Sequence, residues 1–458
     1  MGDLEITKAR EVVILQTGEM SGDMFQVAAA LLVEPRMRVH IIGDKSPGPR
    51  DKADDLYRFY VGDTGISTTR VTIEKVDSMG KRIKKLKTDR KMGNGTPART
   101  VGLATNILQA AFERQDWVPH VREHWLSDQF YQTEKAGILT NAVSESELAF
   151  YVKAKKIPLH QPIVVLWSRH SGKSGGLHPD LDSSYTGLRE LVRAFSLRKC
   201  TPIVVGDDRK NKFLHDKEFQ KYGAIVLPEF WKEQPFAGKL RSAQFRLFDY
   251  LNSLCVLSHV GMRSGNLEAY AYLGHHVVFL EDQRTDSGRM DKLVVPRILL
   301  NMTTVKLSQL PTATGKLYRD PSQVIVGEKS VRELVNEVKK LNKSKKPSAS
   351  EQALILKSNE YEQLNSHDLA LGQVQNFKNW VTHKDGENAG REDIQGLRGF
   401  SWDDIAGILV AVFSYLEVRT KALEIKKQFG QAPEIIRLVF DFVGPLHSSN
   451  KKIVIPRN

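Results

Sequence analysis

The chain has 458 residues, a formal net charge of +13 and a charged fraction of 26%. This length predicts two or three domains, and an apolar fraction of 41% excludes wholesale disorder. With only two cysteines, Cys200 and Cys255, a disulfide-stapled scaffold is excluded as well.

The N-terminal residues predict no export signal, because residues 1–5 hold no basic start followed by an apolar run. The longest apolar stretch, residues 405–416, is broken by Ser414 and is shorter than the ~20 residues that a membrane-spanning helix needs. We therefore expect a cytoplasmic protein without a membrane span, in which residues 405–416 form a buried helix.

Positive charge is concentrated in two runs, residues 80–91 and residues 339–346. Neither run is interleaved with aromatic residues, as a surface that stacks nucleic-acid bases would be. We interpret the first run as a solvated loop and the second as a linker. The net charge permits binding to phosphate-rich partners, so nucleic acid is possible as a partner but not favoured.

The first third of the chain alternates short, apolar, β-branched segments with helical ones. In chain order we expect a strand at residues 11–16, a loop at 17–23, a helix at 24–34 and a strand at 38–43. Residues 44–96 are interpreted as loops with some helix, and residues 100–114 as an amphipathic helix. The β-α-β order that opens this series is the unit of a parallel sheet covered by helices.

A second β-α-β series begins at residue 162. The expected strands are residues 162–167, 201–206, 223–228, 254–258 and 276–280. The expected helices between them are residues 185–198, 243–254 and 266–273. A helix from residue 405 and another from Pro433 to residue 442 are expected near the C-terminus.

A cationic, glycine-rich loop follows the strand of residues 162–167. It holds Arg169 and Lys173 among several glycines, at the end of a strand where open parallel sheets bind ligands. Arg169 suits bidentate phosphate binding, and Lys173 adds a point charge. The loop lacks the first glycine of a P-loop, because Trp167 stands there. A plain surface loop without a ligand is the alternative.

A second candidate site spans residues 258–269. Ser264 and Gly265 stand where the next helix begins and presents free N–H groups to an anion. Glu268 lies one turn further on, where its carboxylate suits ribose hydroxyls. The alternative is simple helix capping, with Ser264 or Asn266 as the N-cap and Glu268 as the acid of a capping box.

This second segment resembles the donor-nucleotide motif of glycosyltransferases with the GT-B fold. In that motif a strand ends in His-x-Gly-x-x-Ser. It is followed by a helix with a Glu and a small residue, then by a Gly, an apolar strand and an acid-Gln pair. The matching positions are His259, Gly261, Ser264, Glu268, Ala269, Gly274, residues 277–280 and residues 281–283. One extra residue separates Ser264 from the Glu, and no Pro follows Gly274.

Other segments share in the resemblance, which covers residues 11–34 and 162–290. The Arg263-Ser264-Gly265 sequence and the earlier basic loop resemble segments of fucosyltransferase-like members that use a guanine nucleotide sugar. Residues 204–208 resemble the strand and acidic end that follow in those enzymes. Residues 17–24 resemble the first glycine-rich loop of lipid A disaccharide synthase, another GT-B enzyme.

The resemblance implies an α/β fold with two Rossmann-like domains facing a cleft and a C-terminal helical extension. Residues 1–157 would form the acceptor-side domain and residues 158–338 the nucleotide-sugar-binding domain. Residues 339–458 would form a linker and a helical region.

It also implies a glycosyltransferase that moves a sugar from a nucleotide sugar, with GDP- and UDP-linked sugars as the candidates, to an acceptor that the sequence does not identify. The implied donor-binding residues are Arg169, Lys173, His259, Gly261, Arg263, Ser264, Gly265 and Glu268. The acceptor base would come from Glu19 or Asp23, with His120 and His124 as further candidates. No metal site and no further cofactor are expected.

Two other classes of function remain open. One is a GT-B-like protein that binds a nucleotide or glycan without turning it over. The other is a basic scaffold that binds polyanions. Nucleotide-sugar binding with turnover would indicate the glycosyltransferase, and binding without turnover the non-catalytic protein. Salt-sensitive binding of polyanions would indicate the scaffold.

Overall fold

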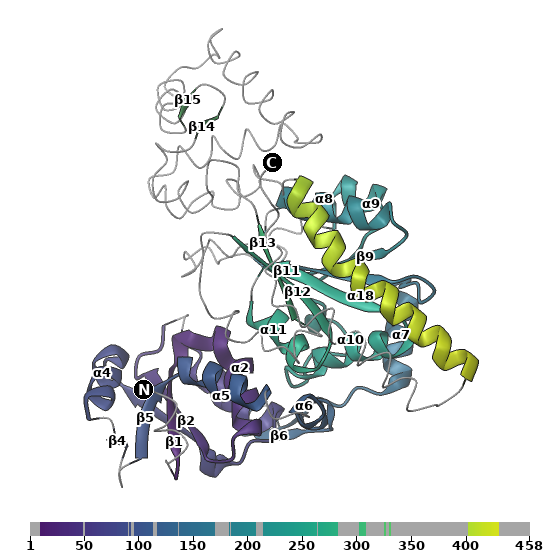
Figure 1. Cartoon of the computed structure of the whole chain (residues 1–458). Helices are drawn as coiled ribbons and strands as arrows, with labels where there is room; N and C mark the ends of the chain where they lie inside the picture. Colours follow the sequence, from purple (N-terminus) through teal and green to yellow (C-terminus); the bar gives the residue numbers. More distant parts are fainter. Residues whose placement is uncertain are drawn as a thin grey trace, which may run out of the picture.

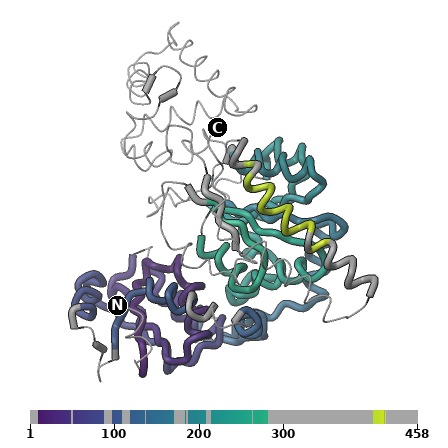
Figure 2. Tube along the Cα trace, in the orientation of Figure 1, coloured from purple at the N-terminus to yellow at the C-terminus, as the bar shows by residue number. Residues whose placement is uncertain are grey.

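The structure is a computed structural model of the full chain (Figure 1). It describes residues 10–48, 51–89, 91–92, 96–112, 117–135, 137–169, 183, 185–207, 214–262, 264–282, 302–307, 325–326, 329–330 and 402–429. The linker and lysine run at residues 339–346 and the helix expected from Pro433 lie outside these residues. Two α/β units, each built on a parallel sheet, lie side by side (Figure 2).

The first sheet has β1 (Val12–Thr17) in its middle. The strand order is β3-β2-β1-β5-β4, and all neighbours except β4 and β5 are parallel. The other bounds are β2 (Met37–Asp44), β3 (Val71–Val76), β4 (Lys91–Met92) and β5 (Thr96–Thr100). Along β1, Val12 and Ile14 pack on one face and Val13 and Leu15 on the other. Both faces are covered, as the uninterrupted apolar sequence predicts.

Helices cover the first sheet on both sides. On one side are α2 (Met24–Val33), α5 (Gly102–Phe112) and α6 (Trp117–Leu126), and on the other is α4 (Met79–Asp89). The remaining elements of this half are η1 (Gly18–Asp23), α3 (Ala53–Arg58), η2 (Phe59–Asp63), η3 (Thr68–Arg70), β6 (Phe130–Thr133), β7 (Gly137–Thr140) and α7 (Glu145–Ala154).

Two interpretations of residues 44–114 were wrong. The stretch of residues 44–96, interpreted as loops with some helix, contains the strand β3 and the first residue of β5, and both strands pair with partners far away in the sequence. The first run of positive charge forms the helix α4 rather than a loop. Leu86 of α4 is buried against the sheet beside Val13 and Leu15, while Lys81, Lys85 and Lys87 are exposed. The run is therefore an amphipathic helix with a solvated basic face.

The second sheet has six parallel strands in the order β10-β9-β8-β11-β12-β13. Their bounds are β8 (Ile163–Ser168), β9 (Thr201–Gly206), β10 (Ile225–Pro228), β11 (Leu257–Met262), β12 (His276–Asp282) and β13 (Met302–Leu307). The chain moves outward from β8 to β10, returns to place β11 beside β8, and moves outward again. This is a doubly wound order, and it confirms the predicted α/β class with two parallel sheets.

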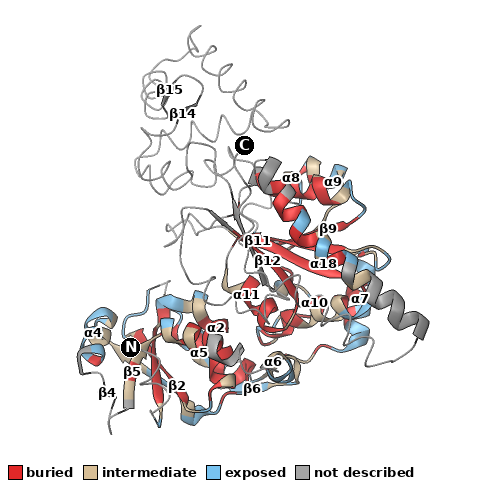
Figure 3. Ribbon diagram, in the orientation of Figure 1, coloured by how far each residue is buried: buried red, intermediate tan, exposed pale blue. Residues whose placement is uncertain are grey.

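Helices connect the strands of this second unit. They are α8 (Tyr185–Ser196), α9 (Lys217–Lys221), η6 (Phe230–Lys232), α10 (Ala243–Leu254) and α11 (Gly265–Tyr272). A separate two-stranded pair consists of β14 (Ile325–Val326) and β15 (Lys329–Ser330). The strands β11 and β12 are buried at the centre of the second sheet (Figure 3).

The expected C-terminal apolar helix is α18 (Trp402–Phe429), and it packs on the second sheet beside α8 (Figure 1). Ile408, Val412 and Leu416 are buried against Val164, Val260 and other residues of one face of that sheet. Tyr415 stacks on His276 of β12, with 4.0 Å between the ring centroids. This helix therefore completes the core of the second unit. In the described part of the chain, no helix is long and apolar enough to cross a membrane.

Removing a buried side chain from α18 should cost stability, whereas removing an outward one should not. We expect Ile408→Ala to lower the free energy of unfolding by about 2–5 kcal/mol, because Ile408 is fully buried. Val410→Ala, at a position that is 58% exposed on the same helix, should change it by less than about 0.5 kcal/mol. Urea unfolding of both variants checks this, and equal effects would mean that α18 does not pack here.

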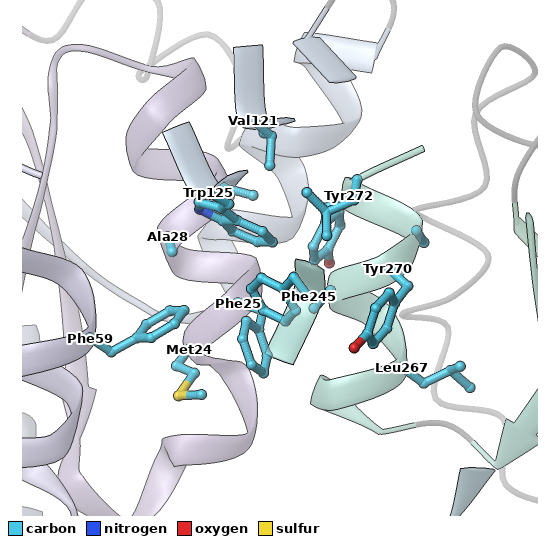
Figure 4. Packing of buried hydrophobic residues seen from close by; sticks show 14 of the residues in the cluster. Met24, Phe25, Ala28, Phe59, Val121, Trp125, Phe245, Leu267, Tyr270 and Tyr272 are labelled. Atoms are coloured by element: carbon cyan, nitrogen blue, oxygen red, sulfur yellow. The ribbon is translucent and has the colours of Figure 1, made fainter. Parts of the chain in front are cut away.

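The two units share one apolar core. A single buried cluster contains Ile14 and Phe25 of the first unit together with Phe245, Tyr270 and Tyr272 of the second. Figure 4 shows Phe25 and Trp125 meeting Phe245 and Tyr272 across the junction. The Trp125 and Phe245 rings stack at 5.5 Å, and the Phe25 and Phe245 rings meet edge to face at 5.5 Å. The placement of the first unit against the second is therefore set by packing.

The domain boundary at residue 157 stays a prediction. The contacts of α7, which precedes this boundary, reach into the second unit. Tyr151 packs against Phe236 with 5.3 Å between the ring centroids, and Lys155 pairs with Glu233 at 2.6 Å. The helix assigned to the first domain thus contacts the second unit.

Candidate functional site

In the second sheet, successive strands are added in one direction from β8 to β10 and in the opposite direction from β11 onward, so β8 and β11 mark the switch point. These strands are hydrogen-bonded neighbours, with Trp167 beside Gly261 in the register. Open parallel sheets bind ligands outside the carboxyl ends of the strands at such a switch point. The two candidate segments follow these two ends, because Arg169 comes directly after β8 and Ser264 two residues after β11. The structure therefore brings the start of both predicted donor-binding loops to one place.

Ser264 is the N-cap of α11. Its Oγ accepts a hydrogen bond from Leu267 N at 3.3 Å, which leaves the amides of Gly265 and Asn266 at the positive end of the helix. The capping explanation thus holds for Ser264. It fails for Glu268, because the acid of a capping box occupies the position of Leu267. Glu268 is 2% exposed, and its Oε2 accepts a hydrogen bond from the Tyr272 hydroxyl at 3.3 Å.

The turn η1 carries the two predicted catalytic acids of the first unit. Gln16, at the end of β1, holds this turn by donating from Nε2 to Met20 O at 2.9 Å. Glu19 is exposed on the turn, and Asp23 is half-buried at its end. Asp23 occupies the N-cap position of α2 but makes no capping hydrogen bond with its side chain. Capping therefore does not account for Asp23.

The turn η1 lies against the beginning of α11. A Cβ on Gly265 would stand 2.2 Å from the carbonyl oxygen of Gly22, so this approach requires a glycine at position 265. The predicted catalytic turn of one unit and the predicted donor-binding turn of the other are thus in contact. No spacing in the sequence predicts this contact, because the two segments lie far apart along the chain.

This close approach makes a testable prediction. We expect Gly265→Ala to displace η1 from α11 and to lower the free energy of unfolding by about 1–3 kcal/mol, because the new methyl group meets backbone rather than a flexible side chain. Gly22→Ala is the matched control, since no atom lies within 4 Å of the Cβ it would add. Thermal unfolding of both variants measures the difference, and equal stability would contradict the contact.

Arg169 is half-buried and fixed through its backbone. Its N–H donates to Ser183 Oγ at 3.0 Å, and its carbonyl accepts from Ser183 N at 2.8 Å. This pairing closes the base of the glycine-rich loop at the end of β8. Lys173 and Arg263 lie outside the described residues, so their donor-binding roles stay predictions.

His259 and Gly261 do not belong to a loop, which corrects the expected end of the strand at residue 258. Both lie inside β11, where β8 and β12 flank them, and His259 is 0% exposed. Trp167 Nε1 donates to His259 Nδ1 at 3.0 Å, and His259 Nε2 lies 3.2 Å from His275 Nδ1. Burial lowers the pKa of the His259 imidazole well below its ordinary value, so it is neutral.

This buried series of hydrogen bonds continues to the junction of the two units. His275 Nε2 lies 3.3 Å from Asp249 Oδ1, and Arg122 of α6 pairs with Asp249 at 2.7 Å. Because Trp167 only donates, the proton on His259 sits on Nε2 and that on His275 on Nε2. The described contacts of His259 are therefore those of a core residue, which supports the candidate site from below rather than facing a ligand. His276, the first residue of β12, follows His275 in the chain but contacts Ser258 and Tyr415 instead.

Arg241 is a candidate that the sequence reasoning missed. It precedes α10, and its Nη2 donates to Asn266 Oδ1 in the first turn of α11 at 2.8 Å. Its guanidinium also lies 5.4 Å from the centre of the Phe25 ring of α2. An exposed cation thus stands where η1, α2 and α11 converge. No motif surrounds Arg241 in the sequence, so only the packing of the two units reveals it.

No protein-family model matches the chain, and comparison with curated proteins found no match. Among solved structures, the chain is similar to ADP-heptose lipopolysaccharide heptosyltransferase II of E. coli, at 11% identity and a TM-score of 0.30, over 72% of this chain and 98% of that chain.

Two further solved structures are similar at the same level. A UDP-glucosyltransferase from Polygonum tinctorium has 9% identity and a TM-score of 0.34, over 85% of this chain and 99% of that chain. HepE of Anabaena, in complex with UDP and glucose, has 12% identity and a TM-score of 0.28, over 65% of this chain and 86% of that chain. At such TM-scores these similarities carry no argument about activity. The fold rests on the strand orders above, and the likeness to fucosyltransferases stays a prediction.

Proposed function

We propose that the protein is a glycosyltransferase that uses a nucleotide-sugar donor. One observation carries this proposal: the contact between η1 and the beginning of α11 at the switch point of the second sheet. This contact brings the turn that carries Glu19 and Asp23 in one unit against the helix N-terminus of the other. A transfer between a bound donor and an acceptor hydroxyl needs this combination of groups.

The diphosphate would bind at the ends of β8 and β11. The amides of Gly265 and Asn266, in the first turn of α11, favour a phosphate group there through hydrogen bonds and the helix dipole. Arg169 directly follows β8, and Arg241 donates to Asn266 in the first turn of α11. These two cations would contact the diphosphate, and Lys173 and Arg263 would add to them. Glu268 would bind a ribose hydroxyl by exchanging its hydrogen bond with Tyr272 for one with the ligand.

The chemistry follows from these positions. The acceptor hydroxyl oxygen forms a bond to the anomeric carbon, and the bond from that carbon to the diphosphate oxygen breaks. In an inverting transfer, Glu19 or Asp23 takes the proton of the hydroxyl. Arg169 and the amides of α11 stabilise the negative charge that develops on the departing nucleoside diphosphate.

Thermal unfolding in the presence of UDP, GDP, ADP and CMP tests donor binding. A nucleotide that binds only the folded chain raises its stability by mass action, about 2.7 kcal/mol at 100 times the dissociation constant. We expect one nucleoside diphosphate to stabilise the wild type and to lose this effect in Arg169→Ala and Glu268→Gln. Lys232→Ala, an exposed cation on η6, is the control that should keep it. The absence of any shift would contradict the proposal.

Turnover separates an enzyme from a protein that only binds. Release of the nucleoside diphosphate from its sugar should be detectable with the wild-type chain, and Glu19→Gln or Asp23→Asn should reduce it by about 10²–10⁴-fold, the contribution of a general base. Unchanged nucleotide affinity in the impaired variant would assign the loss to chemistry. Affinity without any turnover across UDP-, GDP- and ADP-sugars would select the non-catalytic alternative.

A further inference from the structure

One face of α6 carries three side chains whose donor atoms suit a transition metal. His120, Glu123 and His124 each offer one ligand atom, and these atoms lie within 4.8 Å of one another. The histidines are four residues apart, the spacing that places two imidazoles on one side of a helix. His120 and Glu123 are exposed, and His124 is half-buried, so an ion can reach them from solvent.

The hydrogen bonds of the two imidazoles prepare them as ligands. His120 Nε2 lies 3.1 Å from Leu32 O, and His124 Nδ1 lies 2.9 Å from His120 O. Because a carbonyl oxygen only accepts, these nitrogens carry the hydrogens. The lone pairs are then on Nδ1 of His120 and on Nε2 of His124. Metal-binding histidines in proteins typically donate their other N–H to a carbonyl or carboxylate in this way.

The helix that carries these ligands is held in place. Val121 and Trp125, on the adjoining side of α6, are fully buried in the shared core. Arg122 pairs with Asp249 at 2.7 Å and donates to Leu273 O at 2.9 Å. The backbone positions of the three ligands are therefore fixed, and only side-chain rotation is needed to bring their ligand atoms around one ion.

We infer that His120, Glu123 and His124 form a binding site for one divalent ion of the zinc class. Two imidazole nitrogens and one carboxylate oxygen are a ligand set that Zn²⁺ accepts, with water in the fourth position. The site lies on the solvent side of α6, outside the junction of η1 and α11. His120 contacts the C-terminal end of α2, whereas η1 precedes the other end of that helix, so neither histidine serves as the acceptor base in the proposed transfer. The site is independent of that reaction, and it goes beyond the expectation of no metal site.

Zinc titration of the untagged full chain tests this assignment. The protein is first stripped with a chelator, and uptake of Zn²⁺ is then followed by calorimetry without nucleotides. We expect one ion per chain, with binding at least about tenfold weaker in His120→Ala, Glu123→Gln and His124→Ala. The matched control is His160→Ala, at another exposed histidine, which should bind as the wild type does. Co²⁺ should show the visible absorption of a four-coordinate site in the wild type and lose it in His124→Ala.

The variants also need to fold for the titration to be decisive. Thermal unfolding in metal-free buffer should be nearly the same for all four variants, and added Zn²⁺ should stabilise only the wild type and His160→Ala. Glu123→Gln is the most conservative change, because it alters one exposed carboxylate and neither ring. Absence of zinc uptake by the wild type, or uptake that all three ligand variants retain, would overturn the inference.

Discussion

Replacing Phe25 by alanine should lower the free energy of unfolding by about 3–5 kcal/mol, which is the cost of removing a buried aromatic ring from a core. Phe25 is 1% exposed. Its ring lies 5.1 Å from Phe59, 5.5 Å from Phe245 and 6.0 Å from Trp125, measured between centroids. The ring thus joins the first unit to the second, and its loss leaves a cavity at the junction.

Urea unfolding measures this effect, and Phe150→Ala supplies the control. Phe150 lies on α7 and is 75% exposed, so its removal should change stability by less than about 0.5 kcal/mol. If Phe25→Ala were as mild as the control, the two units would not share a packed core in solution. The proposed site, which depends on their contact, would then lose its support.

Asp63→Asn should remove a pH dependence of stability and stabilise the protein above neutral pH. Asp63 ends η2, and its Oδ2 accepts from Ser242 N, just before α10 of the second unit, at 3.1 Å. Its Oδ1 accepts no hydrogen bond from any residue that the structure describes. Burial raises the pKa of the Asp63 carboxyl from its ordinary 3.8 to about 7, against the lowering effect of the Ser242 hydrogen bond and of Arg58.

Stability should fall as the pH rises, because the folded chain holds the Asp63 proton more tightly than the unfolded chain does. The folded chain keeps Asp63 protonated up to about pH 7, whereas the unfolded chain releases this proton near pH 4. The contribution of Asp63 to stability is therefore full below about pH 4 and is lost as the pH rises to 7. A pKa difference of about 3 units corresponds to about 4 kcal/mol.

Urea unfolding of the wild type and of Asp63→Asn between pH 4 and pH 8 measures this contribution. The asparagine keeps an oxygen that accepts from Ser242 N, so the junction is preserved without a charge. Asp77→Asn, at an exposed position, is the control and should leave the pH profile of the wild type unchanged. A difference between wild type and Asp63→Asn that stays constant with pH would contradict the burial of an ionisable Asp63.

Local sequence patterns were sufficient for the elements whose boundaries depend on their own residues. The strand of residues 11–16, the helix at residues 24–34 and the helix at residues 243–254 agree closely with β1, α2 and α10. Ser264 as an N-cap was also predictable, because capping is decided within one turn. The C-terminal apolar run gave the existence of α18, although not the sheet that it covers.

Features that depend on distant partners were not predictable in this way. The end of β11 is set by pairing with β8 and β12, so the sequence could not show that His259 and Gly261 lie within the strand. The burial of Glu268 and the position of Arg241 result from the packing of one unit on the other. For the same reason, the contact of η1 with α11 became visible only in three dimensions.

Hydrogen exchange with and without the most stabilising nucleoside diphosphate tests the central claim most directly. If the ligand binds where the two units meet, amides of residues 17–25 and 262–272 should exchange more slowly in its presence. Amides of α18, on the far side of the second sheet's core, should be unaffected and serve as an internal control. Unchanged exchange in both junction segments, or protection confined to the basic helix α4, would contradict a donor site at this junction.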